Sequence, residues 1–257
     1  MMDGATFDEL HALLDWQVEL GADEAIQDHP VNRYELEPRV AAPVAAKTAA
    51  EPPPKPPAVD PALEAQGAAE RAGDLAALEA ALRAFPHSDL TRGASTVFAQ
   101  GAPEARVMVI GEAPDRDEDR SGHPFAGAPG RLFDAMFAAI GLSREAAAPD
   151  AALYLSAAFP WRPPGDLSPD PAQIALIRPF VERHIALAQP DVLVLMGGLP
   201  CEVLLGKGGI LRLRGKWTEV LGRPALPMLH PRWLLERPEA KRDAWSDLLG
   251  LKARLKT

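Results

Sequence analysis

An acidic, glycine-containing loop provides the first residues that could carry out chemistry. It follows a short apolar run at 105–111 and reads GEAPD over residues 111–115. Glycine lets backbone amides approach a ligand, and a carboxylate such as Glu112 or Asp115 can orient a water molecule or oppose a developing positive charge. A solvated loop between a strand and a helix has the same composition, so this loop alone predicts no particular reaction.

Two further loops contain prolines that restrict the backbone. One reads PWRPPGD over residues 160–166, and the other reads HPRWLL over residues 230–235. A histidine titrates near neutral pH, and the fixed φ of the following proline restricts how His230 projects from the chain. A rigid turn and a structural histidine explain the same residues, so both interpretations stay open at this point.

The segments between these loops define the elements that must position them. Short, continuously apolar runs predict buried strands, and apolar residues three or four apart predict helices. The predicted strands are 105–111, 152–158, 191–197 and 224–229, and the predicted helices lie near 129–141, 171–188, 199–206 and 239–254. This alternation predicts an α/β, three-layer domain around a central, mainly parallel four-stranded sheet. Ligands of such sheets bind outside the carboxyl ends of the strands, where the loops lie.

The chain is expected to have three parts. Residues 1–35 form an N-terminal helical segment, because apolar residues recur at helical spacing over 6–20. Residues 36–73 are predicted to be a disordered linker, because prolines and alanines dominate and large apolar residues are few. The α/β domain is expected over 74–257, with its first helix over 74–84.

Charge is distributed unevenly along the 257 residues. The net charge is −9, yet residues 201–257 carry twelve Lys and Arg against six Asp and Glu, whereas residues 1–37 carry ten acidic residues and one arginine. A basic C-terminal part is compatible with a nucleic-acid-binding face, although a solvated basic helix has the same count.

Other sequence features limit the compartment and the cofactors. No segment approaches the roughly 20 consecutive apolar residues of a membrane-spanning helix, and the acidic start differs from the basic start of a signal peptide. We therefore expect a cytoplasmic protein with no membrane partner. The single cysteine, Cys201, cannot form a disulfide within the chain or hold a metal centre by itself.

Six segments taken together resemble a known family. They are VMVIGEAPD, EDRSGHPFAGAPGRLF, YLSAAFPWRPPGDLSP, RPFVERHIALAQPDVLVLMGG, GILRLRGKW and HPRWLL, and they occur in this order. The chain between about residues 82 and 252 is similar to the uracil-DNA glycosylase superfamily, specifically to its bacterial family 4-type enzymes. No resemblance covers the N-terminal helix or the linker.

The resemblance implies hydrolysis of the N-glycosidic bond of a deaminated base, such as uracil, in DNA. A stacked base is inaccessible, so such enzymes flip the nucleotide into a pocket. As the bond breaks, the sugar gains oxocarbenium-like positive charge and the base leaves as an anion, so the site must stabilise both charges. DNA containing a deaminated base is then the partner.

The resemblance also implies roles for individual residues. Glu112 matches the glutamate of the water-positioning motif, with Gly111 and Ala113 as its backbone neighbours. Phe125 matches the aromatic residue on which the base stacks, and His230 matches the histidine that donates to the base carbonyl. The loop after this histidine matches one that enters the minor groove, and the RLRGKW segment supplies phosphate contacts. The residues expected to bind DNA are Arg212, Arg214, Lys216, Arg232, Trp233 and Leu234.

The chain lacks the four cysteines through which family 4-type enzymes usually bind a four-iron four-sulfur cluster. The corresponding positions hold Phe85, Ser88, Trp161 and Ile177. Apolar side chains at these positions can fill the space by packing. We therefore expect no cofactor and no metal site.

Two departures from the family lie in the expected base pocket. Ala157 stands where the family has the asparagine that pairs with the uracil edge, and its side chain offers no donor or acceptor. Ser156 is the candidate to compensate through its hydroxyl group. Asp115 replaces the final glycine of the family's GEAPG motif and adds a carboxylate that would either activate the water or repel DNA phosphate.

The sequence supports two functions of different classes. One is a cluster-free glycosylase with altered base specificity, because Glu112, Phe125 and His230 are all present. The other is a catalytically degenerate protein that binds DNA or a repair partner, because the cysteines and the asparagine are lost. An unrelated α/β-hydrolase activity lacks support, since the chain has no GxSxG motif. A monomer, and a protein partner for the N-terminal helix, are further expectations.

Overall fold

The computed structural model describes residues 11–12, 15–18, 60–86 and 94–256 of the chain. Contacts divide the chain into two units, Met1–Pro56 and Pro57–Thr257. In the first unit the described residues are helical, and Trp16 and Val18 are largely exposed. The remainder of the predicted N-terminal helix, and the predicted linker up to residue 59, lie outside the described residues.

A six-stranded sheet forms the centre of the second unit, in the order β1-β3-β2-β4-β6-β5. The strands are β1 (Ala99–Gly101), β2 (Val107–Gly111), β3 (Leu153–Ala157), β4 (Val192–Met196), β5 (Thr218–Val220) and β6 (Arg223–Met228). The four inner strands run parallel, whereas β1 and β5 pair antiparallel with β3 and β6 at the two edges. The predicted α/β class with a mainly parallel sheet is confirmed.

The two edge strands were not predicted, and the expected number of four strands was too low. Strands β1 (AQG) and β5 (TEV) have three residues each and lack the continuous apolar run that identifies the inner strands. They form because β3 and β6 would otherwise present unpaired backbone groups at the edges of the sheet, which a short neighbouring segment can bond.

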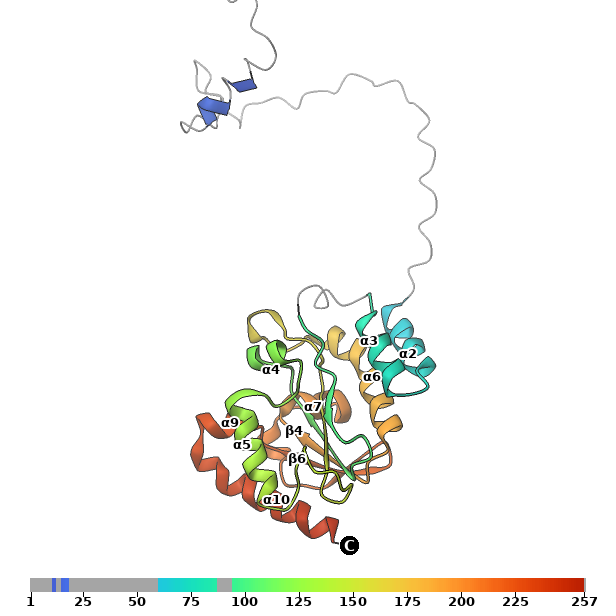
Figure 1. The fold of residues 1–257 in the computed structure, drawn as a ribbon, viewed down its shortest axis with the longest axis vertical. Coiled ribbons are helices and arrows are strands. Elements are labelled where there is room, and N and C mark those ends of the chain that lie inside the picture. Colours follow the sequence, from blue (N-terminus) through green and yellow to red (C-terminus); the bar gives the residue numbers. More distant parts are fainter. Residues whose placement is uncertain (1–10, 13–14, 19–59, 87–93, 257) are drawn as a thin grey trace, which may run out of the picture. The chain divides into compact units, whose positions relative to one another are not determined.

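Helices cover both faces of the sheet. They are α2 (Pro61–Arg71), α3 (Leu75–Arg83), α4 (Arg116–Ser121), α5 (Gly127–Ala138), α6 (Pro171–Ala188), α7 (Gly198–Leu205), α8 (Ile210–Leu213), α9 (Pro231–Glu236) and α10 (Lys241–Leu255), with short 3₁₀ helices at Pro164–Asp166 and Pro238–Ala240. Figure 1 shows α5, α9 and α10 on one side and α2, α3 and α6 on the other. No helix in the described part of the chain is long and apolar enough to cross a membrane.

The inner strands are buried on both faces, as their continuous apolar runs predict. Met108 and Ile110 join a core with residues of α2, α3, α6 and α7, whereas Val107 and Val109 join a second core with residues of α5 and α10. Side chains alternate along a strand, so each strand contributes to both cores. This alternation also decides which residues at the strand ends lie on the same face of the sheet.

Helix α6 shows how local sequence sets an element that supports the sheet. The Asp170 carboxylate accepts from the Gln173 backbone N–H at 2.8 Å, and the Gln173 side chain accepts from the Asp170 N–H at 3.0 Å. These reciprocal bonds satisfy donors that the first helical turn leaves free, and Pro171 at the first position has no N–H to satisfy. The predicted helix 171–188 coincides with α6 for this reason.

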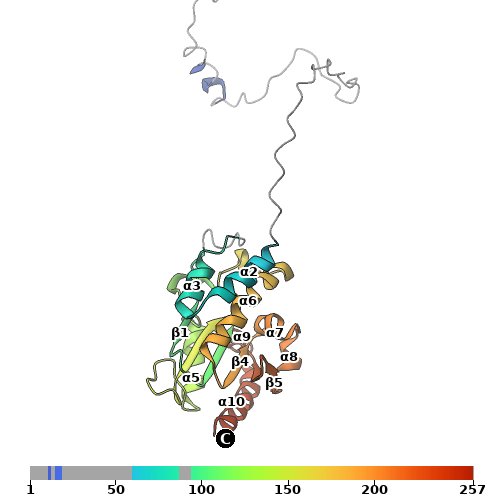
Figure 2. The ribbon, with the colours of Figure 1, turned by 90° about the vertical axis from the view of Figure 1, so that its right-hand side faces the viewer.

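Helix α2 corrects the predicted boundary of the linker, which was placed at 36–73. The Asp60 carboxylate caps this helix by accepting from the Ala62 N–H at 3.0 Å, and Ala65 and Ala69 are buried. Arg183 of α6 donates to the Ala72 carbonyl oxygen at 2.7 Å, and Figure 2 shows α2 alongside α6. The alanines that suggest low complexity in the sequence are small residues that let the two helices approach.

Candidate active site

The carboxyl ends of the parallel strands bring three of the predicted site residues to one edge of the sheet. Gly111 at the end of β2 pairs with Ala157 at the end of β3. Met196 at the end of β4 pairs with Met228 of β6, two residues before His230. The loops singled out in the sequence therefore leave the sheet side by side.

Glu112 is held in place by the start of α7. Its Oε1 accepts from the Gly198 backbone N–H at 2.7 Å, across 86 residues of sequence. Gly197 has φ +118°, and a Cβ atom there would collide with the Glu112 carboxylate. The glycine pair at the end of the third predicted strand, which is β4, is therefore a site feature that sequence reasoning missed, although a double glycine at a strand end was visible.

Glu112 also lines a cavity of about 220 Å³. The cavity lies between the loop after β2, the loop that contains Asp166, the start of α7 and the loop that contains Gly209. Ala113 and Arg232 belong to the same lining. The cavity gives Glu112 access to a small group or a water molecule at the carboxyl edge of the sheet.

Phe125 lies against His230, the histidine that is expected to donate to the base carbonyl. Its ring stacks on Phe133 of α5 with 4.4 Å between centroids, and on His230 with 5.3 Å and an interplanar angle of 21°. A Cβ atom on Gly111 would lie 2.8 Å from the Phe125 ring, so glycine at this position makes room for the ring. The structure thus brings together Gly111, Phe125 and His230.

His230 is a neutral hydrogen-bond donor in this arrangement. Its Nδ1 accepts from the Arg232 backbone N–H at 3.2 Å, at the start of α9. Burial lowers the pKa of His230 to about 3, and the Arg232 charge acts in the same direction. A neutral imidazole with an accepting Nδ1 carries its proton on Nε2, which can donate to another group.

The sequence leaves two roles open for Asp115, activation of the water or repulsion of DNA phosphate, and the structure shows its carboxylate bound within the protein. Its Oδ1 accepts from the backbone N–H groups of Asp117 and Glu118 at 2.8 and 3.0 Å and thereby caps α4. Its Oδ2 accepts from Arg232 at 3.1 Å. Both oxygens are engaged, so the charge of Asp115 is offset within the protein.

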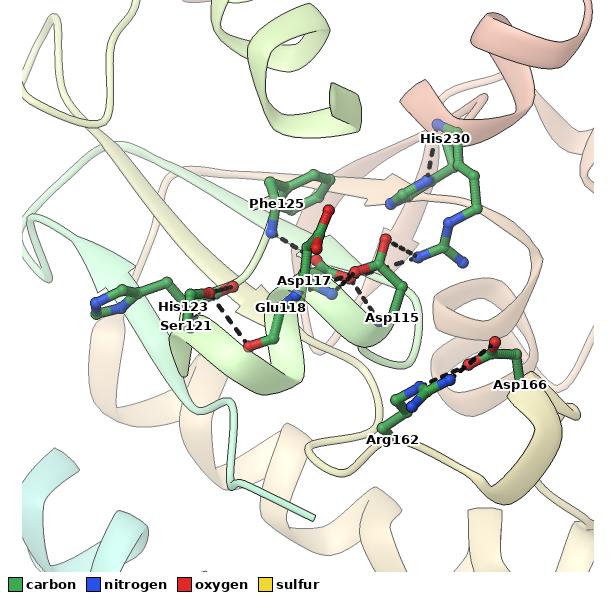
Figure 3. Close-up of polar contacts among 10 residues, drawn as sticks. Asp115, Asp117, Glu118, Ser121, His123, Phe125, Arg162, Asp166 and His230 are labelled. Carbon is green, nitrogen blue, oxygen red and sulfur yellow. Dashed lines mark hydrogen bonds and ion pairs between the residues drawn. The ribbon is translucent and has the colours of Figure 1, made fainter. Parts of the chain in front are cut away.

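Glu118 is a residue near the site that sequence reasoning missed. Its side chain is 9% exposed, and its carboxylate accepts from the backbone N–H groups of Phe125 and Asp115. Burial raises the pKa of Glu118 to about 7. Figure 3 shows Glu118 between Phe125 and Asp115. The D-x-x-E spacing of a capping box was present in the sequence and could have identified this glutamate.

Ser156 points away from the predicted base pocket, so its expected compensation for the missing asparagine is wrong. Its hydroxyl donates to the Phe98 carbonyl oxygen at 3.0 Å and lies 3.3 Å from His184 Nδ1. Tyr154, two residues earlier, has its hydroxyl 2.9 Å from His184 Nε2. Ser156 and Ala157 lie on opposite faces of β3, because successive side chains of a strand alternate.

The predicted DNA-binding residues separate into exposed and engaged groups. Arg212 and Lys216 are exposed. Arg214 instead donates to the buried Asp247 carboxylate at 2.5 and 3.0 Å, so it stabilises the contact with α10. Its expected phosphate contact is not supported, because its charge is already paired.

The loop after His230 differs from its prediction in a similar way. Leu234 is fully buried, so it cannot act as an exposed wedge, whereas Leu235 is 42% exposed. Trp233 is half-buried and lies under the Arg237 guanidinium at 4.6 Å from the ring centroid. The helical geometry of α9 decides this pattern, because adjacent side chains of a helix point in different directions.

Three of the four positions expected to replace cluster cysteines are described, and their side chains offer no ligand for an iron–sulfur cluster. Phe85, Trp161 and Ile177 are buried in one hydrophobic core, and Phe85 packs edge-on against Phe180 at 5.4 Å. Ser88 lies outside the described residues. Cys201 is buried in α7, where its thiol donates to the Gly197 carbonyl oxygen. In the described part of the chain, no group of three or more His, Cys, Asp or Glu side chains is arranged to hold a metal ion.

Comparison with known proteins identifies the family of this chain. The model of the uracil DNA glycosylase superfamily matches residues 98–249. A type-4 uracil-DNA glycosylase of Archaeoglobus fulgidus is 32% identical over 156 residues, which cover 57% of this chain and 75% of the relative. One of Thermotoga maritima is 28% identical over 167 residues, 63% of this chain and 84% of the relative. The chain therefore belongs to the uracil-DNA glycosylase superfamily.

Proposed function

We propose that this chain is a DNA glycosylase that hydrolyses the N-glycosidic bond of a deaminated base. The observation that carries the proposal is the neutral His230, stacked beside Phe125, at the edge of the sheet where Glu112 is fixed against α7. These groups are suited to the two charges that develop when a base leaves a sugar. The type-4 glycosylase relatives support the same reaction class.

The leaving base is the first charge to be stabilised. With its proton on Nε2, His230 donates a hydrogen bond to a base carbonyl as that oxygen becomes anionic. Because its pKa is about 3, the imidazole acts as a fixed hydrogen-bond donor and not as a proton source. The Phe125 ring provides the apolar face against which the flipped base lies.

The sugar and the attacking water are the second part of the reaction. Gly198 engages one oxygen of the Glu112 carboxylate, which leaves the other oxygen for a water molecule in the adjoining cavity. The same negative charge stabilises the oxocarbenium-like sugar. Asp115 has no part in this step, because its oxygens are bound to the protein.

Ala157 determines the proposed base specificity. Without an amide at this position the pocket loses a bidentate contact to the uracil edge, and Ser156 faces the other side of β3. A site built to pair with a substrate edge discriminates by on the order of 10⁴-fold, so its loss removes most of the preference for uracil. We propose acceptance of several deaminated bases that present a carbonyl to His230.

We also propose that the enzyme works without an iron–sulfur cluster. Phe85, Trp161 and Ile177 supply the packing in the region where family members hold the cluster. Iron and sulfide analysis of pure protein tests this point. A stoichiometric cluster would contradict the proposal.

A non-catalytic role is the second candidate, and Ala157 is the observation that favours it. A protein that has lost the base-reading amide can retain DNA binding through exposed cations such as Arg212 and Lys216.

The remaining proposals are a monomer that acts in the cytoplasm and an N-terminal segment that docks on a protein partner. Mass measurement in solution tests the monomer, and capture by the isolated N-terminal segment tests the protein partner.

Single-turnover reactions distinguish the two candidates. Labelled duplexes that contain uracil, hypoxanthine or xanthine are incubated with excess protein, and abasic sites are cleaved by alkali. A glycosylase releases at least one base, and His230→Ala abolishes this release while DNA binding persists. Salt-dependent binding with no release from any substrate would establish the non-catalytic candidate instead.

A further inference from the structure

Asp115, Glu118 and Arg232 form a charged cluster between two loops, which we call the clasp. Arg232 Nη2 lies 3.1 Å from Asp115 Oδ2 and 3.4 Å from Glu118 Oε2. The arginine follows His230 by two residues, and both acids belong to the loop and helix that follow Glu112. The clasp thus links the two segments that carry the proposed catalytic groups, across 117 residues of sequence.

Glu118 also binds the backbone beneath the proposed base platform. Its Oε1 accepts from the Phe125 N–H at 2.6 Å, and its Oε2 accepts from the Asp115 N–H at 2.8 Å. Phe125 has φ +54°, a conformation that is uncommon for residues with a side chain and requires support from its surroundings. Arg144 supports the same residue from its carbonyl side, by donating to the Phe125 carbonyl oxygen at 3.2 Å.

The third contact of Glu118 links it to His230 through Arg232. The Arg232 side chain donates to Glu118, and the Arg232 backbone N–H donates to His230 Nδ1. The orientation of the imidazole and the orientation of the Phe125 ring therefore depend on one buried carboxylate. Glu118 lies outside the lining of the cavity at Glu112.

We propose that Glu118 is a positioning residue, whose carboxylate form holds Phe125 and His230 in the positions that the reaction requires. This inference rests on the proposed glycosylase function. It assigns Arg232 to the clasp in the DNA-free protein, in place of the direct DNA contact expected from the sequence. The clasp then explains why Asp115 is tolerated where family members have glycine, since its charge is paired with Arg232.

Protonation of Glu118 provides a means to test the clasp. A carboxylate accepts all three donors, whereas a protonated carboxyl has a hydrogen that conflicts with one of them. The charged groups that act on Glu118 are Asp115 and Arg232. The surrounding charges act on these two or on one another: Asp166 interacts with Arg162 and Arg232, and Arg162 also interacts with Asp115 and Asp119. Because burial places the pKa of Glu118 at about 7, the clasp weakens as the pH falls below that value.

The kinetic experiment compares Glu118→Gln with Asp117→Asn. Both variants neutralise a carboxylate of the same helix, but the Asp117 side chain is 53% exposed and pairs only loosely with Arg120 at 3.6 Å. We expect Glu118→Gln to lower the single-turnover rate constant by about 10- to 100-fold and to change the Kd for DNA by less than about 3-fold. The rate of the wild-type protein should rise with pH through about 7, and this limb should be absent in Glu118→Gln. Equal rates and equal pH profiles for wild type and Glu118→Gln would overturn the inference.

A second measurement does not depend on activity. In ¹H–¹⁵N spectra of the full chain, the amide signals of Phe125 and Asp115 should titrate with one common midpoint near pH 7. Arg232→Met should move this midpoint upward, because the arginine charge favours the carboxylate. Independent midpoints, or a midpoint unchanged by Arg232→Met, would refute the clasp. Titration of both amides in a wild-type protein that releases no base would refute the proposed function and leave the clasp intact.

Discussion

Gly197→Ala is the substitution for which the structure predicts the sharpest loss of function. A Cβ atom on residue 197 would overlap the Glu112 carboxylate, and φ +118° with ψ −176° is a backbone conformation that is almost restricted to glycine. The strain costs about 1–3 kcal/mol, which lowers Tm by about 3 °C per kcal/mol in a domain of this size. The collision also displaces Glu112 from Gly198. A displacement of about 1 Å is sufficient for a rate loss of roughly 100-fold.

Gly206→Ala is the matched control for this substitution. Gly206 ends the same helix, has φ +64°, and has open space where a Cβ atom would lie. Its replacement therefore introduces a similar backbone strain, about 1–2 kcal/mol, without touching Glu112. The assay measures Tm and the single-turnover rate constant for both variants.

The outcome separates displacement of Glu112 from general destabilisation. We expect both variants to lose stability and only Gly197→Ala to lose the rate. In a Glu112→Ala background, Gly197→Ala should cause no further loss of rate, because its target is already absent. A Gly197→Ala protein that retains its rate within about twofold, or a Gly206→Ala protein that loses as much, would falsify this account of how Glu112 is held.

Three other predictions follow from the charged groups. Because burial raises the pKa of Glu118 from 4.5 to about 7, the folded state binds an extra proton in this window, and about 3 kcal/mol of stability is lost as the pH rises through it. Denaturant unfolding of wild type and Glu118→Gln at pH 4 and pH 8 should therefore differ in their pH dependence by about this amount. Arg214→Met leaves the buried Asp247 carboxylate without its partner and should cost about 3 kcal/mol in the same assay; a loss below about 1 kcal/mol would show that the pair is unimportant. Arg212→Ala should reduce the slope of log Kd against log salt for DNA by about one, and an unchanged slope would remove this residue from the interface.

The sequence by itself determined the features that depend on residues close together in the chain. Four continuous apolar runs were sufficient to predict β2, β3, β4 and β6, because strands buried on both faces have no polar alternation. Parallel strands end at a common edge, so the loops that contain Glu112 and His230 could be brought together before the structure was known. The absence of cysteines at the matched positions was also evident from residue types alone.

Tertiary structure decided which of these residues are available. The Arg232 partner of Asp115 Oδ2 and the Gly198 partner of Glu112 lie 117 and 86 residues away, and no local pattern shows these two contacts. Leu234 and Leu235 look alike in the sequence, but the packing of helix α9 buries one and exposes the other. Ser156 faces His184 because the register of β3 assigns its side chain to the face opposite Ala157. Long-range pairing and strand register are properties of the packed fold, and so the roles of these polar groups could be assigned only there.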